Sequence, residues 1–375
     1  MNSLATKARW LGALVTAGLL LVAGAGTAGA RTADARTTDA RTADGGGPVR
    51  GVPQTAPLKL PAQGVAVSPD GRTAYVSVGH TTSGARLDVV DTQSGAVTAE
   101  LLLNAGHEIA VGQVAVSPDG SRVYVLYGLG RHLQLSMLAV VDTATNTVIA
   151  RVAAPDQPRP ERTATGRLSG LAVSDDGTRV FVAQEGPKPG NRPILEGARI
   201  LQFSPQRLAY TAAVTVPGKY SWGVAVRPGS GDAYVATDEG LTHLDTSGDV
   251  PVLEKTIARA GGQFAGLSAS PDGTRLYRVD GSGAGAVVDL ATDTVTSTFT
   301  VDKGQSMRAL PLNADGSRLY TLVGGSTVLS IDTSTTAAVP GENVTGIEGG
   351  RDLALGPDGH TFYVAAGYNL RIIGF

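Results

Sequence analysis

Residues 65–78 read VAVSPDGRTAYVSV: an alternating apolar segment, a Ser-Pro-Asp-Gly turn and a second apolar segment that carries a tyrosine. The alternation predicts two half-buried strands, and the Pro-Asp-Gly turn between them predicts a hairpin. The pattern returns at residues 114–125, 171–182, 224–235, 267–279, 310–321 and 353–364. In the fourth copy RPGSGD replaces the turn, but the aromatic residue follows in its usual place. Such self-similarity is the signature of a repeat architecture.

Each repeat contains more than this hairpin. A third apolar segment follows and ends in Asp or Asp-Thr, as in VVDT at residues 89–92 and 140–143 and IDT at 331–333. The aspartate is expected to cap the next turn with its carboxylate. A fourth segment, such as residues 96–101 or 295–299, completes the unit. Four strands in a repeat of about 40–50 residues are typical of one β-propeller blade.

The two ends of the repeat region complement each other. Residues 370–375 form the third strand of the seventh copy, which therefore lacks a fourth strand, and residues 55–60 precede the first copy without an assigned partner. Pairing these two segments would leave no open sheet edge. We therefore predict an all-β fold over residues 55–375. It is a seven-bladed β-propeller of four-stranded antiparallel blades, in which the N-terminal strand pairs with the C-terminal blade and closes the ring. Residues 55–60 should be essential to its stability.

Composition agrees with this fold and excludes several classes of protein. The 375 residues include 50 Gly and 20 Pro, which leave little room for long helices. Hydrophobic residues make up 42% of the chain, enough for a large core, and the net charge of −2 argues against a nucleic-acid-binding protein. The chain has no cysteine, so disulfides, thiolate metal sites and a cysteine nucleophile are excluded.

The N-terminal 54 residues show a different pattern. Lys7 and Arg9 precede an apolar run over residues 10–25, and AGA at residues 28–30 matches a cleavage site. This predicts a signal peptide over residues 1–30, whereas an uncleaved membrane anchor would need about 20 apolar residues. Residues 31–54 contain a five-residue echo without large apolar side chains, which predicts a flexible linker. No other segment is long and apolar enough to cross a membrane, so we expect a protein that is secreted or associated with the cell wall.

The Asp-Gly turn, the following Tyr-Val and the Val-Val-Asp-Thr end of the third strand carry a resemblance. Together they resemble the YVTN family of β-propeller repeats, found in secreted and cell-surface proteins of bacteria and archaea. The resemblance covers about residues 55–375 and implies a propeller fold. Related propellers include lactonases, subunits of quinoprotein amine dehydrogenases and surface-layer adhesion modules, so the resemblance does not select one activity.

In a propeller, the loops from second to third strand and from one blade to the next meet at the mouth of the central channel. By analogy with the fold, we expect the binding site there. Two of these loops, residues 155–168 and 186–197, are long insertions that flank the third blade; they mark either the binding side or surface length without a role. The aromatic residues of the repeats are expected to pack between blades instead.

Alignment of the copies places one residue of each blade where its innermost strand begins. These residues are Gln63, Gly112, Ser169, Trp222, Ala265, Arg308 and Arg351. We predict that Gln63, Lys219, Tyr220, Trp222, Arg308 and Arg351 form a ligand site. Two guanidiniums opposite an aromatic ring could hold an anionic or carbohydrate-like ligand. In the alternative, the arginines pair with the nearby Glu348 or Asp352.

Catalytic motifs are missing from the sequence. It has no G-x-S-x-G motif, no phosphate-binding loop and no calcium loop of the D-x-D-x-D-G type. His80, His107, Glu108 and His132 fall in predicted mouth loops and could bind a divalent metal, although their spacing is not that of a known metal motif and solvated loop histidines are the simpler interpretation.

The sequence therefore favours a non-catalytic binding or scaffold module. We expect it to recognise a small molecule or a protein outside the cytoplasmic membrane, without a cofactor, and to be a monomer. The alternative is a lactonase-like or other metal-assisted hydrolase with its site at the channel mouth; a third possibility is a subunit of a redox complex whose cofactors sit on another chain.

Overall fold

The computed structural model describes residues 54–80, 84–106, 110–129, 135–160, 163–189, 192–257, 262, 265–301 and 310–375. They belong to the second of the two units into which the chain divides, Pro48–Phe375. The signal peptide and linker predicted for residues 1–54 lie outside them, apart from Gln54.

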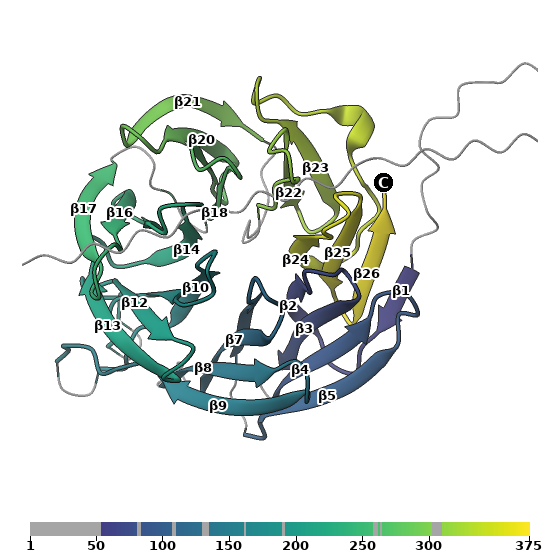
Figure 1. Cartoon of the computed structure of the whole chain (residues 1–375), viewed down its shortest axis with the longest axis horizontal. Helices are drawn as coiled ribbons and strands as arrows, with labels where there is room; N and C mark the ends of the chain where they lie inside the picture. Colours follow the sequence, from purple (N-terminus) through teal and green to yellow (C-terminus); the bar gives the residue numbers. More distant parts are fainter. Residues whose placement is uncertain are drawn as a thin grey trace, which may run out of the picture. The chain divides into compact units, whose positions relative to one another are not determined.

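Strands of this unit are arranged as seven antiparallel sheets, or blades, around a centre (Figure 1). Blade 1 consists of β2 (Ala62–Val67), β3 (Thr73–His80), β4 (Gly84–Asp91) and β5 (Val97–Asn104). Blade 2 consists of β6 (Ala110–Val116), β7 (Arg122–Leu129), β8 (Leu135–Asp142) and β9 (Thr147–Ala153). Blade 3 consists of β10 (Leu168–Val173), β11 (Val180–Gln184), β12 (Arg199–Ser204) and β13 (Ala209–Thr215). Blade 4 consists of β14 (Ser221–Val226), β15 (Ala233–Thr237), β16 (Leu241–Asp245) and β17 (Val252–Ile257).

The remaining three blades differ in how they are completed. Blade 5 consists of β18 (Gly266–Ala269), β19 (Arg275–Val279), β20 (Ala284–Asp289) and β21 (Thr294–Thr300). Blade 6 has two strands in the described residues, β22 (Arg318–Val323) and β23 (Thr327–Asp332). Blade 7 combines β24 (Gly350–Leu355), β25 (Thr361–Ala366) and β26 (Asn369–Gly374) with the N-terminal β1 (Gln54–Pro57). The predicted fold class, an all-β propeller of four-stranded antiparallel blades, is confirmed, with blade 6 as the exception.

The N-terminal strand lies in the sheet of the last blade. β1 pairs antiparallel with β26, with Ala56 opposite Leu370, and the backbone N–H of Leu58 donates to the carbonyl of Tyr368. The segment predicted for this role, residues 55–60, therefore overlaps β1, which ends at Pro57. What this pairing contributes to the stability of the ring stays a prediction.

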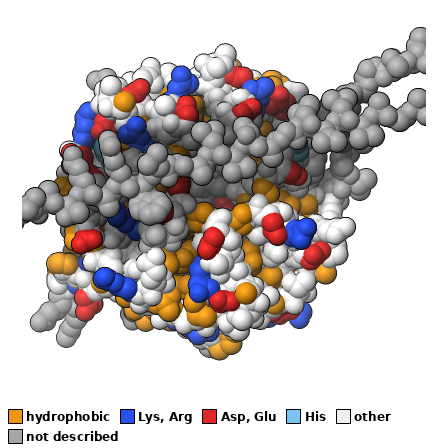
Figure 2. All heavy atoms as spheres, in the orientation of Figure 1, with side chains coloured by type: hydrophobic (Ala, Val, Ile, Leu, Met, Phe, Trp, Pro, Cys, Tyr) orange, Lys and Arg blue, Asp and Glu red, His pale blue; other side chains and the backbone are white. Residues whose placement is uncertain are grey.

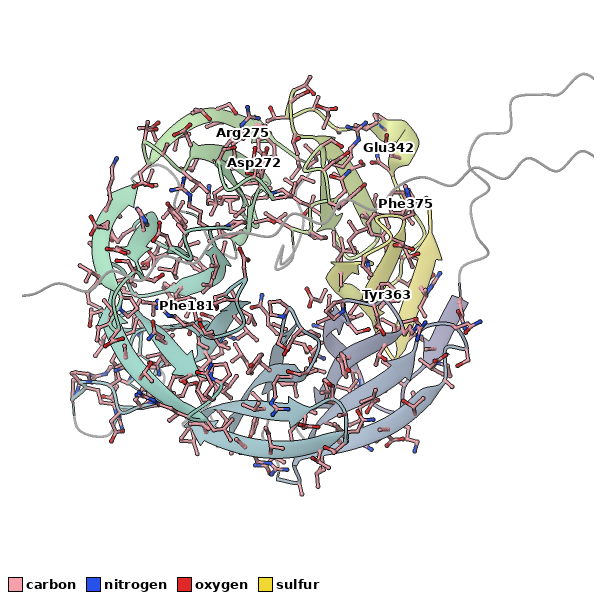
Figure 3. All side chains as sticks on the ribbon, in the orientation of Figure 1. Phe181, Asp272, Arg275, Glu342, Tyr363 and Phe375 are labelled. Carbon is pink, nitrogen blue, oxygen red and sulfur yellow. The ribbon has the colours of Figure 1, made fainter. Side chains whose placement is uncertain are left out.

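Blade 6 departs from the four-strand pattern on its outer side. A short 3-10 helix, η1 (Pro340–Glu342), lies where other blades have a fourth strand. Val328 and Val344 exchange backbone hydrogen bonds, and Val339 donates to Ser330. Proline lacks the N–H that a strand ladder needs and restricts φ, so Pro340 interrupts the strand. Glu342 anchors the segment through an ion pair with Arg318 at 2.9 Å (Figure 3).

The core consists of seven apolar clusters, one between each pair of neighbouring blades. Each contains the aromatic residue that follows the repeated turn: Tyr75, Tyr124, Phe181, Tyr234, Tyr277, Tyr320 and Tyr363. All seven are at most 5% exposed, and Figure 3 shows Phe181 and Tyr363 within the body of the ring. Their prediction as core residues is confirmed.

Candidate ligand-binding site at the channel mouth

A cavity of about 190 Å³ lies where the innermost strands of the first five blades begin. Its lining includes the residues Gln63, Gly112, Ser169, Trp222 and Ala265, which the repeat alignment placed in one ring. The other described residues of the lining are Val111, Gln113, Leu126, Tyr127, Gly128, Ser136, Arg167 and Leu168. The structure thus brings together five of the seven aligned positions, from blades that are far apart in the sequence.

Glycine in the inner strands lets neighbouring blades approach closely. A Cβ atom on Gly64 of β2 would lie 2.7 Å from the carbonyl oxygen of Gly112 in blade 2. One on Gly223 of β14 would lie 2.7 Å from the carbonyl oxygen of Ala265 at the start of blade 5. Since real side chains do not tolerate such distances, glycine keeps the channel wall thin and leaves the cavity open.

Trp222 forms the aromatic part of the wall. It belongs to β14, is 8% exposed, and stacks on Tyr220 with ring centroids 5.9 Å apart and planes at 4°. The backbone N–H groups of Lys219 and Tyr220 both donate to Asp238 Oδ1 at 2.9 Å, which fixes the chain just before β14. The Lys219 ammonium lies 3.3 Å from Glu196 in an exposed ion pair. Of these three predicted residues, Trp222 belongs to the described lining of the cavity. Tyr220 and Lys219 precede Trp222 in the sequence and do not belong to that lining.

The two long loops of blade 3 are held together by buried polar contacts. The Gln157 amide, 4% exposed, donates to the carbonyl oxygens of Glu185 and Gly197 and accepts a hydrogen bond from the N–H of Gly166. Arg199, 5% exposed, donates to Gln184 Oε1 and to two carbonyls of the first loop. The two loops are therefore cross-linked, and the first of them contributes Arg167 and Leu168 to the lining of the cavity.

Arg167 is the charged residue that these loops bring to the cavity. Its Nη2 lies 2.8 Å from Glu185 Oε1, and Glu185 is 5% exposed. Sequence reasoning did not single out Arg167, because the insertion that contains this residue has no counterpart in other repeats. Gln113 was also missed, although the aligned position holds glycine in blades 1, 3, 4 and 5 (Gly64, Gly170, Gly223 and Gly266). The departure from glycine at this position is the sequence signal that could have identified Gln113 as a candidate site residue.

The two predicted arginines do not join this site in the described residues. Arg351 lies in β24, is exposed and is not part of the cavity lining. Its neighbour Asp352 is buried and accepts a hydrogen bond from the backbone N–H of Val65 at 3.0 Å, linking blade 7 to blade 1. Arg308 lies outside the described residues.

The alternative metal site cannot be located. His107, Glu108 and His132 lie outside the described residues, and for His80 only the backbone, at the end of β3, is described. Among the residues that the structure describes, no group of three or more His, Asp or Glu side chains could hold a metal ion. The described lining of the cavity includes no Asp, Glu or His.

A second polar cluster lies away from the mouth, between blades 4 and 5. His243 of β16 stacks on Tyr234 with ring centroids 4.6 Å apart, and its Nδ1 lies 2.8 Å from Asp293 Oδ2. The Tyr234 hydroxyl donates to Asp293 Oδ1, and burial raises the pKa of this hydroxyl. These contacts join two blades, as expected for structural residues.

No helix of the described residues is long and apolar enough to span a membrane. A space-filling view shows apolar side chains over the sector of the first two blades, among scattered charges of both signs (Figure 2).

Comparisons with known proteins give a fold and no family. No family model matches the sequence, and no curated protein matches it. Among solved structures, the chain is similar to Kuenenia stuttgartiensis hydrazine synthase, with a TM-score of 0.65 and 17% identity over 85% of this chain and 97% of that chain. This likeness shows the fold alone. The chain is a β-propeller, an architecture that supports a general binding or scaffold module.

Proposed function

We propose that the chain is an exported, non-catalytic β-propeller that recognises a ligand or protein partner outside the cytoplasmic membrane, at the mouth of its channel. The observation that carries the proposal is the convergence of Gln63, Ser169, Trp222 and Arg167 on one cavity. Its described lining offers hydrogen-bonding and aromatic groups but no Asp, Glu or His side chain. Concave sites with a few polar groups in apolar walls are typical of ligand recognition.

Export rests on the N-terminal pattern. Residues 1–30 have the charged, apolar and small-residue regions of a signal peptide, and residues 31–54 supply a tether. The YVTN-like repeats support the same assignment by resemblance. Fractionation of the producing cells, with mass spectrometry of the N-terminus, tests it. We expect the chain in the medium or the cell wall with Arg31 as its first residue; an intact N-terminus in the cytoplasm would contradict export.

Binding is tested by a thermal-shift screen of the purified chain against divalent metals, lactones, small anions and sugars. A ligand at about 100 times its Kd stabilises a protein by about 2.7 kcal/mol, which shifts the melting temperature measurably. We expect the shift to vanish in Gln63→Ala and to persist in Ser247→Ala. Ser247 lines a separate cavity of about 310 Å³ among the turns of blades 3 and 4.

The same screen separates the rival function. The metal-assisted hydrolase rests on the sequence positions of His80, His107, Glu108 and His132. A metal-dependent shift that disappears in His107→Ala, together with turnover of a lactone, would replace the non-catalytic proposal. A shift by small ligands that Gln63→Ala leaves intact would move the site away from this cavity.

A further inference from the structure

The side chains of two glutamines line the cavity. Gln63 lies in β2 and Gln113 in β6, and both are partly buried. Neither side chain forms a hydrogen bond within the part of the chain that the structure describes. A primary amide offers two N–H donors and a carbonyl acceptor side by side. Two such groups suit a ligand whose own groups both donate and accept.

Two serine hydroxyls add to this set. Ser136 Oγ lies 3.3 Å from the carbonyl oxygen of Gly166, and Ser169 Oγ lies 3.0 Å from Ser221 Oγ. A hydroxyl that donates one hydrogen bond retains lone pairs that can accept another. Blades 1, 2 and 3 therefore all contribute side chains that can donate and accept hydrogen bonds to the lining of the cavity.

The charges of the described wall cancel. Arg167 is the charged residue among the described lining, and it is paired with the buried Glu185. Because Glu185 compensates its charge, Arg167 gives an anionic ligand little net attraction, and an anion that drew Arg167 away would leave the Glu185 carboxylate buried without its partner. A cationic ligand would meet the guanidinium. Both kinds of charge are thus disfavoured relative to a neutral ligand.

The same lining also has an apolar part. Trp222, Leu168 and Leu126 belong to the same lining. A sugar ring has hydroxyl groups on its edge and C–H groups on its face, so it can form hydrogen bonds and apolar contacts at the same time. Tryptophan is suited to such mixed contacts. The volume of about 190 Å³ lies below the range of about 300–1,000 Å³ typical of sites for drug-sized ligands, so the occupant is small.

We propose that the cavity binds one neutral monosaccharide unit, as a free sugar or as the end of a glycan, through Gln63, Gln113 and the wall around Trp222. This inference rests on the proposed function, because it names the ligand class of the same site.

Isothermal titration of the purified full chain with glucose, galactose, mannose and N-acetylglucosamine tests the inference, with glucuronate, glucosamine and phosphate as charged probes. We expect at least one neutral sugar to bind with a millimolar Kd and the affinity to fall at least tenfold in Gln113→Leu, which keeps the side-chain size and removes the amide. Gln206→Leu, an exposed glutamine in the turn after β12, is the matched control and should leave the Kd unchanged. Disaccharides of the bound sugar distinguish the sources: tighter binding than the monosaccharide indicates a glycan end, equal or weaker binding a free sugar.

Contrary outcomes separate the two proposals. Binding of glucuronate or phosphate that is lost in Gln113→Leu, without binding of neutral sugars, overturns the sugar inference and leaves the cavity as the ligand site. Neutral-sugar binding that Gln113→Leu and Gln63→Ala both retain places the sugar elsewhere and overturns the inference as well. If none of these probes binds in the titration and no compound shifts the melting temperature in the screen, the proposal of a small-ligand site itself is overturned.

Discussion

The Ser, Asp and Thr side chains that recur in the repeats stabilise the turns of their blades through hydrogen bonds. In the first turn, Ser68 Oγ donates to Asp70 Oδ1 at 2.6 Å and accepts from the N–H of Thr73 at 3.0 Å. At the end of the third strand, the Asp91 carboxylate accepts from the N–H of Ser94, and Thr92 Oγ1 donates to the carbonyl of Gly71. The Asp-Thr pair thus caps its own turn and ties it to the first, which confirms the predicted capping role of the aspartate.

The turn glycines allow a test at single-residue resolution. Gly71 has φ +73°, and a Cβ there would lie 3.1 Å from Pro357 of blade 7; Gly359 has φ +70° and open space around it. Because left-handed backbone costs an L-residue roughly 1–2 kcal/mol, we expect Gly359→Ala to lower the free energy of unfolding by about that amount. Gly71→Ala should lower it further, since Pro357 must also move. Urea denaturation of both variants measures the difference, and equal losses would show that the contact between these blades does not matter.

Asp88 gives the protein a distinctive pH dependence. Its side chain is 3% exposed in β4, and burial, with Glu100 nearby, raises its pKa to about 6 despite the opposing effect of Arg86 and Lys59. The folded state therefore holds the proton more tightly than the unfolded chain. The contribution of the Asp88 carboxyl group to the free energy of unfolding is therefore fully present below about pH 4 and is lost as pH rises through about 6.

We expect Asp88→Asn to remove this loss and to raise the free energy of unfolding at pH 7 by about 2 kcal/mol. Urea denaturation of the wild type and the variant between pH 4.5 and 7.5, a window set by the two pKa values, measures the difference. Hydrogen bonds from Ser117 and from Ser334 lower the pKa of Asp119 and Asp332, respectively, to about 2, so their contribution is lost as pH falls from about 4 to about 2, outside this window. A difference between the two proteins that does not change with pH would contradict the assignment to Asp88.

At the scale of elements, β1 is the strand whose removal is most informative. Ala56 of β1 is fully buried, Leu58 just beyond it is 7% exposed, and both belong to the cluster between blades 7 and 1. Deletion of residues 1–60 would remove these contacts and expose the hydrogen-bonding edge of β26.

We expect that truncation to lower the free energy of unfolding by more than about 3 kcal/mol relative to a truncation of residues 1–53, which keeps β1. Thermal and urea unfolding of the two shortened chains provide the comparison. An unchanged melting temperature would refute the proposal that the N-terminal strand closes the ring.

At the scale of the whole molecule, an apolar cluster of the same kind lies between each pair of neighbouring blades in the described residues. A blade with fewer backbone hydrogen bonds than the others should therefore differ from them in local stability. The outer segment of blade 6 is bonded to β23 by scattered contacts, such as those of Val339 with Ser330 and of Asp332 with Ala337. The outer strands β5 and β9 of blades 1 and 2 instead form ladders of six paired residues each, which include bulges. Segments with few backbone hydrogen bonds open locally at a lower free energy.

Hydrogen exchange followed by mass spectrometry should reveal this difference. We expect amides of residues 335–345 to exchange at least about tenfold faster than those of β5 and β9. Equal protection of all three segments would show that blade 6 is as stable as the complete blades.

Much of this architecture could be predicted from repetition alone. Repeats with similar sequences are expected to adopt similar structures. Aligning the repeats therefore identified the hairpins, the aromatic residue of each apolar cluster between blades, and the start of each inner strand. Gln63, Ser169 and Trp222 could be assigned to one ring for this reason. The predicted ring also contained Arg351, which lies in its inner strand but outside the cavity lining, because alignment gives a register position and not the direction of a long side chain.

The recurring features, namely the strand pattern, the turn chemistry and the core, could be predicted from the sequence because they depend on contacts within a repeat and with its immediate neighbours. Features that occur once required the folded structure. They are the pairing of Arg167 with Glu185, the amides of Gln63 and Gln113 that have no hydrogen-bond partner among the described residues, and the interrupted outer strand of blade 6. They depend on how an insertion folds back or on which groups meet across the channel, and hydrophobic periodicity carries no information about either.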